Sequence, residues 1–370
     1  MGAGTIANPQ EQDLLDRARR GDETAFDSLI SPYRGELHAH CYRMLASTHD
    51  AEDALQDALL KAWRGISRFE GRSSFRSWLY KIATNASLDA IGRRPKRVLP
   101  IDYPATDPSQ ASGDPLVESV WIEPYPDEQL AIEDGFAGPE ASFERREGVE
   151  LAFTAALQHL PANQRAALIL REVLGFSAKE AADMLDTSTA SINSALQRAR
   201  KTVEERLPEQ SQQDTIRELG DDGVREVVDA FVEAWDRSDV DGVVAMLTED
   251  AAFTMPPLRT WYGRSREALT QFITNGPLSG KWSWRHIRTT ANGQPALAFY
   301  SWDEARQTHL PFALNVLTLR GDKISEIDAF ICRSTESTDP ETYANYPEER
   351  IEPRALKAYF EIFGMPPNLD

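Results

Sequence analysis

The sequence predicts a multidomain chain, with two all-α regions on the N-terminal side and an α+β domain on the C-terminal side. Three observations predict this class. The chain has 370 residues, which is too long for one ordinary hydrophobic core. Apolar side chains recur at helical spacing through the first 100 residues and again over residues 142–207. Beyond residue 222, a helical segment is followed by short alternating runs that are typical of β-strands.

The first helical region covers residues 12–100. Its clearest pattern is DAEDALQDALLKAW at residues 50–63, where alanine, leucine and tryptophan occupy one helical face. Acidic and amide side chains occupy the opposite face. A second helix is predicted within residues 72–94, and it ends before Pro95 because proline cannot continue a helix. One face of the helix at 50–63 therefore belongs to a core.

Residues 101–141 are rich in proline and read as a linker. Residues 101–149 carry twelve acidic and two basic side chains. The stretch WIEPYPD differs from its surroundings, because a solvated linker rarely contains a tryptophan. We therefore expect this stretch to dock into an apolar groove. The residues expected to dock are Trp121, Pro124, Tyr125 and Pro126.

A helix-turn-helix is predicted within residues 142–207. A first helix ends at Gly175, and Ser177 with Glu180 forms the capping box of a second helix. Ser188 is the expected N-cap of a third helix, which turns Ile192, Leu196 and Ala199 inward. Its outward side chains are hydroxyls, amides and guanidinium groups, the types that contact base edges and phosphates in the major groove. This region is predicted to bind DNA.

The C-terminal part is predicted as an α+β domain over residues 208–335, with its core from about residue 222, and a tail over residues 336–370. A helix at 224–237 precedes strand-like runs at 251–255, 295–302 and 312–331. Gly321 and Asp322 mark a hairpin turn in the last run. The tail contains an amphipathic helix with Leu356, Tyr359, Phe360 and Phe363 on one stripe.

Charge and cysteine usage limit the classes of function. The net charge of -19 argues against DNA binding by the whole chain, but the acidity is concentrated in the linker and the C-terminal part. Cys41 and Cys332 form neither a disulfide framework nor a zinc motif, and we expect no metal and no cofactor. No apolar run approaches the length of a membrane span, so we expect a cytoplasmic protein without membrane contact.

These motifs together resemble region 2 and region 4 of the sigma-70 family, in the two-domain form called extracytoplasmic-function sigma factors. The resemblance covers residues 12–100 and 142–207. It implies that the protein directs promoter-specific transcription as a subunit of bacterial RNA polymerase. The helix at 50–63 resembles the one that docks on the clamp helices of the polymerase β′ subunit, with Asp53, Gln56 and Asp57 facing the partner.

The resemblance also implies two contacts with promoter DNA. The segment from Phe69 through the following helix resembles regions 2.3 and 2.4, which open the minus-10 element. The residues expected there are Arg72, Tyr80, Lys81, Asn85, Arg93 and Arg94. An unpaired base needs an aromatic surface, a hydrogen-bonding edge and nearby cations. Phe69 and Trp78 are further candidates for stacking, although Phe75 and Trp78 are equally suited to the core.

The third helix of the helix-turn-helix would contact the minus-35 element. The residues expected there are Ser188, Ser191, Asn193, Ser194, Gln197, Arg198 and Arg200. Many members of the family place basic residues where this chain has Asn193 and Ala195. Fewer cations imply weaker binding by the free protein and a shallower dependence on salt.

Residues 222–335 resemble a SnoaL-like domain, a cone-shaped α+β fold whose aromatic-lined pocket is an active site in some relatives. The aromatic and histidine side chains available for a pocket are Trp261, Tyr262, Trp282, Trp284, His286, Trp302 and His309. Core packing is the favoured explanation for the aromatic side chains, and we find no catalytic constellation. We expect this domain to regulate the sigma regions in cis by contacting the linker and region 2. An anti-sigma partner is not indicated by the sequence.

Two alternatives remain open at the level of sequence. One is a ligand-responsive helix-turn-helix regulator that binds an operator as a dimer. The helix at 50–63 has no role in such a protein. The other is a SnoaL-like small-molecule enzyme fused to a DNA-binding module. The sequence contains no P-loop, His-Glu-x-x-His or Gly-x-Ser-x-Gly motif that would favour it.

Overall fold

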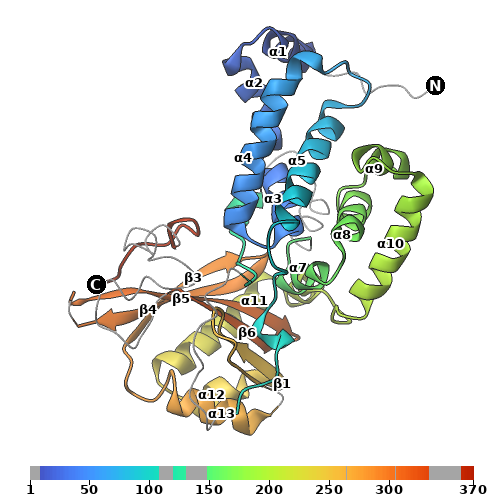
Figure 1. Cartoon of the computed structure of the whole chain (residues 1–370). Coiled ribbons are helices and arrows are strands. Elements are labelled where there is room, and N and C mark those ends of the chain that lie inside the picture. The colour runs from blue at the N-terminus through green and yellow to red at the C-terminus, as the bar shows by residue number, and fades with distance from the viewer. Residues whose placement is uncertain (1–8, 108–119, 131–147, 264, 305, 333–359) are drawn as a thin grey trace. The chain divides into compact units, whose positions relative to one another are not determined.

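The computed structural model describes residues 9–107, 120–130, 148–263, 265–304, 306–332 and 360–370 (Figure 1). The chain divides into two compact units. Residues 1–96 and 129–207 form the first unit, and residues 97–128 and 208–370 form the second. The chain therefore passes between the units three times, and part of the predicted linker belongs to the second unit.

The N-terminal part of the first unit is helical. Its elements are α1 (Pro9–Arg19), α2 (Glu23–Ile30), η1 (Ser31–Tyr33), α3 (Arg34–Leu45), α4 (Thr48–Gly65), η2 (Ile66–Arg68) and α5 (Phe75–Ile91). Helix α4 begins at the cap residue Ser47, whose side chain accepts a hydrogen bond from the Asp50 amide. Ser74 caps α5 in the same way. The apolar stripe predicted for residues 50–63 is confirmed, since Ala51, Leu55 and Ala58 are buried.

The second part of the first unit contains the helix-turn-helix. Its elements are α7 (Leu151–Gln158), α8 (Ala162–Leu168), the π-helical turn η5 (Ile169–Val173), α9 (Ala178–Met184) and α10 (Thr189–Glu204). The capping box of Ser177 and Glu180 opens α9 as predicted. Ser188 caps α10 and accepts a hydrogen bond from the Ser191 amide. The Asp186 backbone has a φ of 48°, so the turn between the two helices passes through the left-handed region.

The second unit is built on one six-stranded sheet in the order β2-β1-β6-β5-β4-β3. The strands are β1 (Leu247–Thr254), β2 (Trp261–Gly263), β3 (Trp284–Ala291), β4 (Gln294–Asp303), β5 (Thr308–Arg320) and β6 (Lys323–Ile331). Strands β1 and β6 are parallel, and the other neighbours are antiparallel. The hairpin expected at Gly321 is confirmed by the pairing of β5 with β6.

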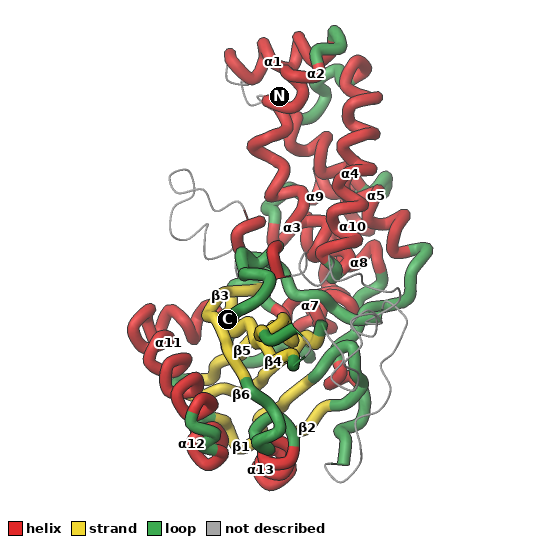
Figure 2. The backbone as a smooth tube through the Cα atoms, turned by 90° about the vertical axis from the view of Figure 1, so that its left-hand side faces the viewer, coloured by secondary structure: helices red, strands yellow, loops and turns green. Residues whose placement is uncertain are grey.

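Three helices cover one face of this sheet (Figure 2). They are α11 (Gln212–Asp236), α12 (Val240–Ala245) and α13 (Arg266–Asn275). Phe231 and Trp235 of α11 belong to the same buried cluster as Leu297, Phe299 and other inward residues of the sheet. The cluster is the core of the unit, and the mixed sheet with its helices confirms the α+β class expected from the sequence.

Helix α11 begins earlier than the predicted residue 224. It contains a kink at Gly220, whose φ of 67° is outside the helical range. The start of α11 is fixed by Gln212, whose side-chain amide donates to the Leu319 carbonyl and accepts from the Leu319 amide. The amphipathic helix predicted in the tail lies almost entirely outside the described residues. Of its apolar stripe, Phe360 and Phe363 are described, and both are buried.

Candidate nucleic-acid interface

The three residues predicted to contact polymerase lie on one exposed face of α4. The side chains of Asp53 and Asp57 are each 54% exposed. Gln56 lies between them and donates a hydrogen bond to Glu52. Leu60 continues this face, and it is one of the few large apolar side chains that are exposed. The face thus combines carboxylates with an apolar side chain, which suits a protein partner.

The loop before α5 is held by an aromatic cluster. The ring centroid of Phe69 lies 5.0 Å from that of Trp78 and 5.8 Å from that of Phe75. Phe69 and Phe75 are buried, and Trp78 is half-buried. These rings pack against one another, so their first role here is structural. Arg72 stands out of this cluster with 85% of its side chain exposed and pairs with Glu70.

Tyr80 lies in a different place from the one expected of a base-stacking residue. The ring is fully buried, and its hydroxyl donates to the Glu36 carboxylate. The ring also makes edge contacts with His40 and with Phe176 of the loop before α9. Burial raises the pKa of Tyr80 above its ordinary value. In this arrangement Tyr80 presents no aromatic surface to DNA.

The remaining predicted minus-10 residues differ in their surroundings. Lys81 donates to the Asp183 carbonyl at 2.8 Å and to the Asp186 carboxylate at 2.6 Å. Asn85 is half-buried on α5, and Arg93 is exposed just beyond its end. Arg94 forms an ion pair with the buried Asp50 of α4. The structure therefore brings Arg93 and Arg94 to the same end of α5, while Lys81 faces the helix-turn-helix.

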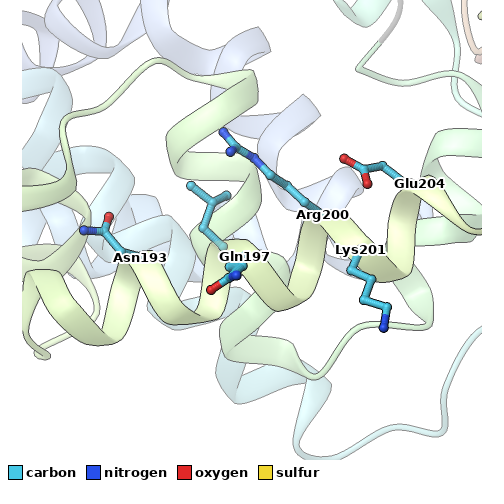
Figure 3. Close-up of a pocket in the computed structure, with 6 residues that line it drawn as sticks. Asn193, Gln197, Arg200, Lys201 and Glu204 are labelled. Atoms are coloured by element: carbon cyan, nitrogen blue, oxygen red, sulfur yellow. The ribbon is translucent and has the colours of Figure 1, made fainter.

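The predicted minus-35 residues all lie on the exposed surface of α10 and its cap. Asn193, Gln197 and Arg200 are among the α10 residues that line a shallow hollow (Figure 3). The other residues that line it are Leu196, Lys201 and Glu204. Arg198 donates to the Ser194 hydroxyl at 2.8 Å one turn earlier. The face is polar and carries three cations within residues 198–201.

Glu172 is a residue of this surface that the sequence did not reveal. Its carboxylate forms an ion pair with the guanidinium group of Arg200. The two residues are 28 positions apart and belong to different helices, so no local spacing signals the pair. Because the pair occupies one of the few cations of α10, Glu172 lowers the positive potential of the recognition face.

The docking stretch of the linker contacts the sheet through backbone hydrogen bonds. The Tyr125 amide donates to the Asn292 side chain, and the Asn292 amide donates to the Tyr125 carbonyl, both at 2.8 Å. Pro126 forms a β-bridge with Ala291. Trp121, Pro124, Tyr125 and Pro126 are all buried. We call residues 97–107 and 120–128 the docked segment.

The docked segment also contacts the opposite edge of the sheet. The indole of Trp261 in β2 donates to the Tyr103 carbonyl at 2.9 Å, and the Thr106 amide donates to the Trp261 carbonyl. Trp261 therefore holds the linker instead of lining a pocket. The turn at Asn292 and Gly293, which binds Tyr125 of the docked segment, was not predicted from the sequence either, although Asn-Gly is a strong hairpin signal.

Two carboxyl groups, of Glu326 and Asp328, lie buried in the sheet on β6. Asp328 of β6 accepts a hydrogen bond from the Thr254 hydroxyl at 2.6 Å. Burial raises the pKa of Asp328 to about 7. Burial and the neighbouring Asp328 also raise the pKa of Glu326. Within the described residues, no group of histidine, cysteine and carboxylate side chains is arranged to hold a metal ion. No helix of the described part is long and apolar enough to cross a membrane.

Comparisons with known proteins give the same three regions. Family models for sigma-70 region 2, sigma-70 region 4 and a SnoaL-like domain match residues 29–97, 150–203 and 228–327. The ECF RNA polymerase sigma factor SigG of Mycobacterium tuberculosis H37Rv is 41% identical over 318 residues, which cover 85% of this chain and 82% of SigG. The RNA polymerase sigma-H factor of Pseudomonas aeruginosa is 29% identical over 202 residues, which cover 55% of this chain and 96% of that protein.

Among solved structures, the extracytoplasmic-function sigma factor SigJ of Mycobacterium tuberculosis is similar in fold. The two superpose with a TM-score of 0.51 at 21% identity, and the match covers 80% of this chain and 93% of SigJ. The similarity therefore extends through the helical regions into the C-terminal domain.

Proposed function

The chain belongs to the family of extracytoplasmic-function RNA polymerase sigma factors, and from this premise we propose which of its surfaces direct promoter-specific initiation. The exposed face of α4, with Asp53, Gln56 and Asp57, binds core polymerase at the β′ clamp helices. Helix α5, with Lys81, Asn85 and the two arginines that follow it, and the segment before it contact the minus-10 element. The polar face of α10 contacts the minus-35 element. The observation that carries the proposal is that α10 and its cap Ser188 expose all seven predicted residues, and none of them is acidic.

The polymerase contact is tested by reversing charge on α4. We expect the double substitution Asp53→Arg and Asp57→Arg to weaken binding to purified core polymerase by about tenfold or more, because like charge would replace a complementary pair. The matched control is Glu23→Arg with Asp27→Arg, which changes the charge equally on the exposed surface of α2. Run-off transcription on genomic DNA should fall in the same order. Equal polymerase binding by both double variants would contradict the assignment of α4.

We also propose that the SnoaL-like domain regulates the sigma regions in cis through the docked segment. The supporting observation is the buried pairing of Tyr125 with Asn292. Asn292→Gly removes the side-chain acceptor and keeps a residue that adopts positive φ. The control is Asp322→Gly, at the exposed turn between β5 and β6. If hydrogen exchange shows that the Tyr125 amide is released while transcription with core polymerase is unchanged, the regulatory role is wrong.

The proposed role assigns catalysis to the polymerase and not to this chain. We therefore expect the protein to act in the cytoplasm, beside the chromosome, without turning over a small molecule. Mass spectrometry of the purified protein, before and after incubation with a bacterial metabolite extract, tests this expectation. Consumption of an extract component that the heat-denatured protein leaves unchanged would contradict it.

A further inference from the structure

Lys81, which the proposed function assigns to the minus-10 DNA, is held by the helix-turn-helix of the same unit. Its ammonium group donates to the Asp183 carbonyl at 2.8 Å and to the Asp186 carboxylate at 2.6 Å. Both acceptors lie at the end of α9 and in the turn that leads to α10. Two oxygen atoms thus contact the ammonium group, as the oxygen atoms of a DNA phosphate would.

Neighbouring contacts keep these oxygen atoms in place. Ser77, one turn before Lys81, donates to Oε1 of Glu180 at 3.2 Å. The second oxygen of Glu180, Oε2, accepts from the Ser177 amide and closes the capping box of α9. The guanidinium group of Arg76 lies 4.8 Å from the ring centroids of both Tyr80 and Phe176. The start of α9 is therefore fixed against α5 by charge, hydrogen bonds and aromatic faces together.

We propose that the turn of the helix-turn-helix masks Lys81, with the Asp186 carboxylate occupying the position of a DNA phosphate. The inference rests on the proposed function, in which Lys81 contacts DNA. While region 4 is packed against region 2, Lys81 is therefore not available to contact DNA. DNA that reaches Lys81 must displace Asp186, so binding of the minus-10 strand and separation of α9 from α5 favour each other.

The strength of the contact suits such an exchange. The side chain of Lys81 is 37% exposed and that of Asp186 is 76% exposed, so water screens the pair. Removing an ion pair of this kind changes an equilibrium by about two- to fivefold. A phosphate with its neighbouring charges can compete with a pair of this strength, whereas a fully buried pair would stay closed.

The test compares Asp186→Asn with Asp183→Asn. Both substitutions remove one negative charge at the same end of α9, but Asp183 contacts Lys81 only through its backbone carbonyl. Asparagine tolerates the positive φ of residue 186, so the turn is preserved. Brief acetylation of the full chain, followed by mass spectrometry, reports the reactivity of Lys81 against that of the exposed Lys179. We expect about a two- to fivefold rise for Asp186→Asn and no change for Asp183→Asn.

The second measurement uses a fluorescein-labelled single-stranded DNA of mixed sequence. We expect Asp186→Asn to bind it about two- to fivefold more tightly than Asp183→Asn does, and the gain to vanish when Lys81→Gln is added. Equal Lys81 reactivity in both variants overturns the masking. Increased reactivity without tighter DNA binding overturns the competition with phosphate. Run-off transcription on the same proteins tests the proposed function separately. If no variant supports transcription, the proposed function is contradicted, and the labelling result is unaffected.

Discussion

The contact between α5 and α9 and the contact between the docked segment and the sheet both join residues more than 100 positions apart, but they differ in chemistry. Lys81 and Asp186 are joined by partly exposed side chains. Tyr125 and Asn292 are joined by two hydrogen bonds that include the backbone of a fully buried residue. Exposed pairs exchange with water and ligands, whereas buried backbone bonds are lost only when the surrounding structure opens. The first contact is suited to a change of partner, and the second to a permanent attachment.

The largest expected effect comes from removing a buried anchor of the docked segment. Tyr125→Ala deletes a fully buried ring, and we expect it to lower the free energy of unfolding of the second unit by about 3 to 5 kcal/mol. Ile101→Ala is the control, since Ile101 belongs to the same segment and is 38% exposed. Urea denaturation followed by tryptophan fluorescence measures both. Similar midpoints for the two variants would show that the segment is not anchored by burial.

The contact between the two halves of the first unit also has a buried part, and Arg165 tests it. Its guanidinium group donates to the Met44 carbonyl and to Gln158, and burial lowers the pKa of Arg165 to about 10, so it stays charged near neutral pH. We expect Arg165→Ala to cost about 2 to 3 kcal/mol, because buried acceptors lose their donor. Arg198→Ala, on the exposed face of α10, should cost less than about 0.5 kcal/mol. Hydrogen exchange of α3 amides distinguishes the two. Unchanged exchange in both variants would show that Arg165 does not hold the two halves together.

Asp328 makes the sheet of the second unit sensitive to pH. Its pKa is raised from 3.8 to about 7, so the folded state holds a proton that the unfolded state has released between those values. The contribution of Asp328 to stability is therefore present below about pH 4 and is lost as the pH rises through 7. Asp328→Asn should remove this dependence and stabilise the second unit at pH 8 by an amount on the order of 2 kcal/mol. Parallel stability profiles of the two proteins between pH 5 and 8 would contradict the prediction.

The smallest expected effect concerns the recognition helix. Glu172→Gln releases Arg200 from its ion pair, and we expect DNA affinity to rise by less than about 1 kcal/mol. The salt dependence should become steeper by up to about one phosphate contact. Glu205→Gln is a control of equal charge change near the end of α10. Fluorescence anisotropy at several salt concentrations measures both quantities. An identical slope for the two variants would show that Arg200 does not reach DNA.

The elements with local signals could be predicted from the sequence. The apolar stripe of α4, the capping box at Ser177 and the cap at Ser188 each depend on residues within one or two turns, so spacing reveals them. The turn at Asn292 and Gly293 has an equally local signal. Its partner Tyr125 is 167 positions away, however, and no periodicity connects the two.

Other parts of the candidate site could not be read locally because they depend on packing between distant segments. Tyr80 has an apolar ring and a polar hydroxyl, and its sequence position fits either a core or a DNA surface. Only tertiary contact decides between these two roles, because the Tyr80 hydroxyl donates to Glu36, which is 44 positions away in the sequence. The pairing of Lys81 with Asp186 is of the same kind. The sequence thus identifies the charged groups, but only the fold shows which of them already form ion pairs or hydrogen bonds within the protein.

The order in which the chain visits the two units has a mechanical consequence. Residues 129–207 begin and end where the chain leaves and re-enters the second unit, at residues 128 and 208. The backbone therefore joins the helix-turn-helix to the second unit at both of its ends, and it joins the N-terminal helices to that unit at residue 97. A loop fastened at two points explores less space than an arm fastened at one. Because the N-terminal helices pack against the helix-turn-helix, as the pair of Lys81 and Asp186 shows, all three backbone connections restrain the first unit as one body.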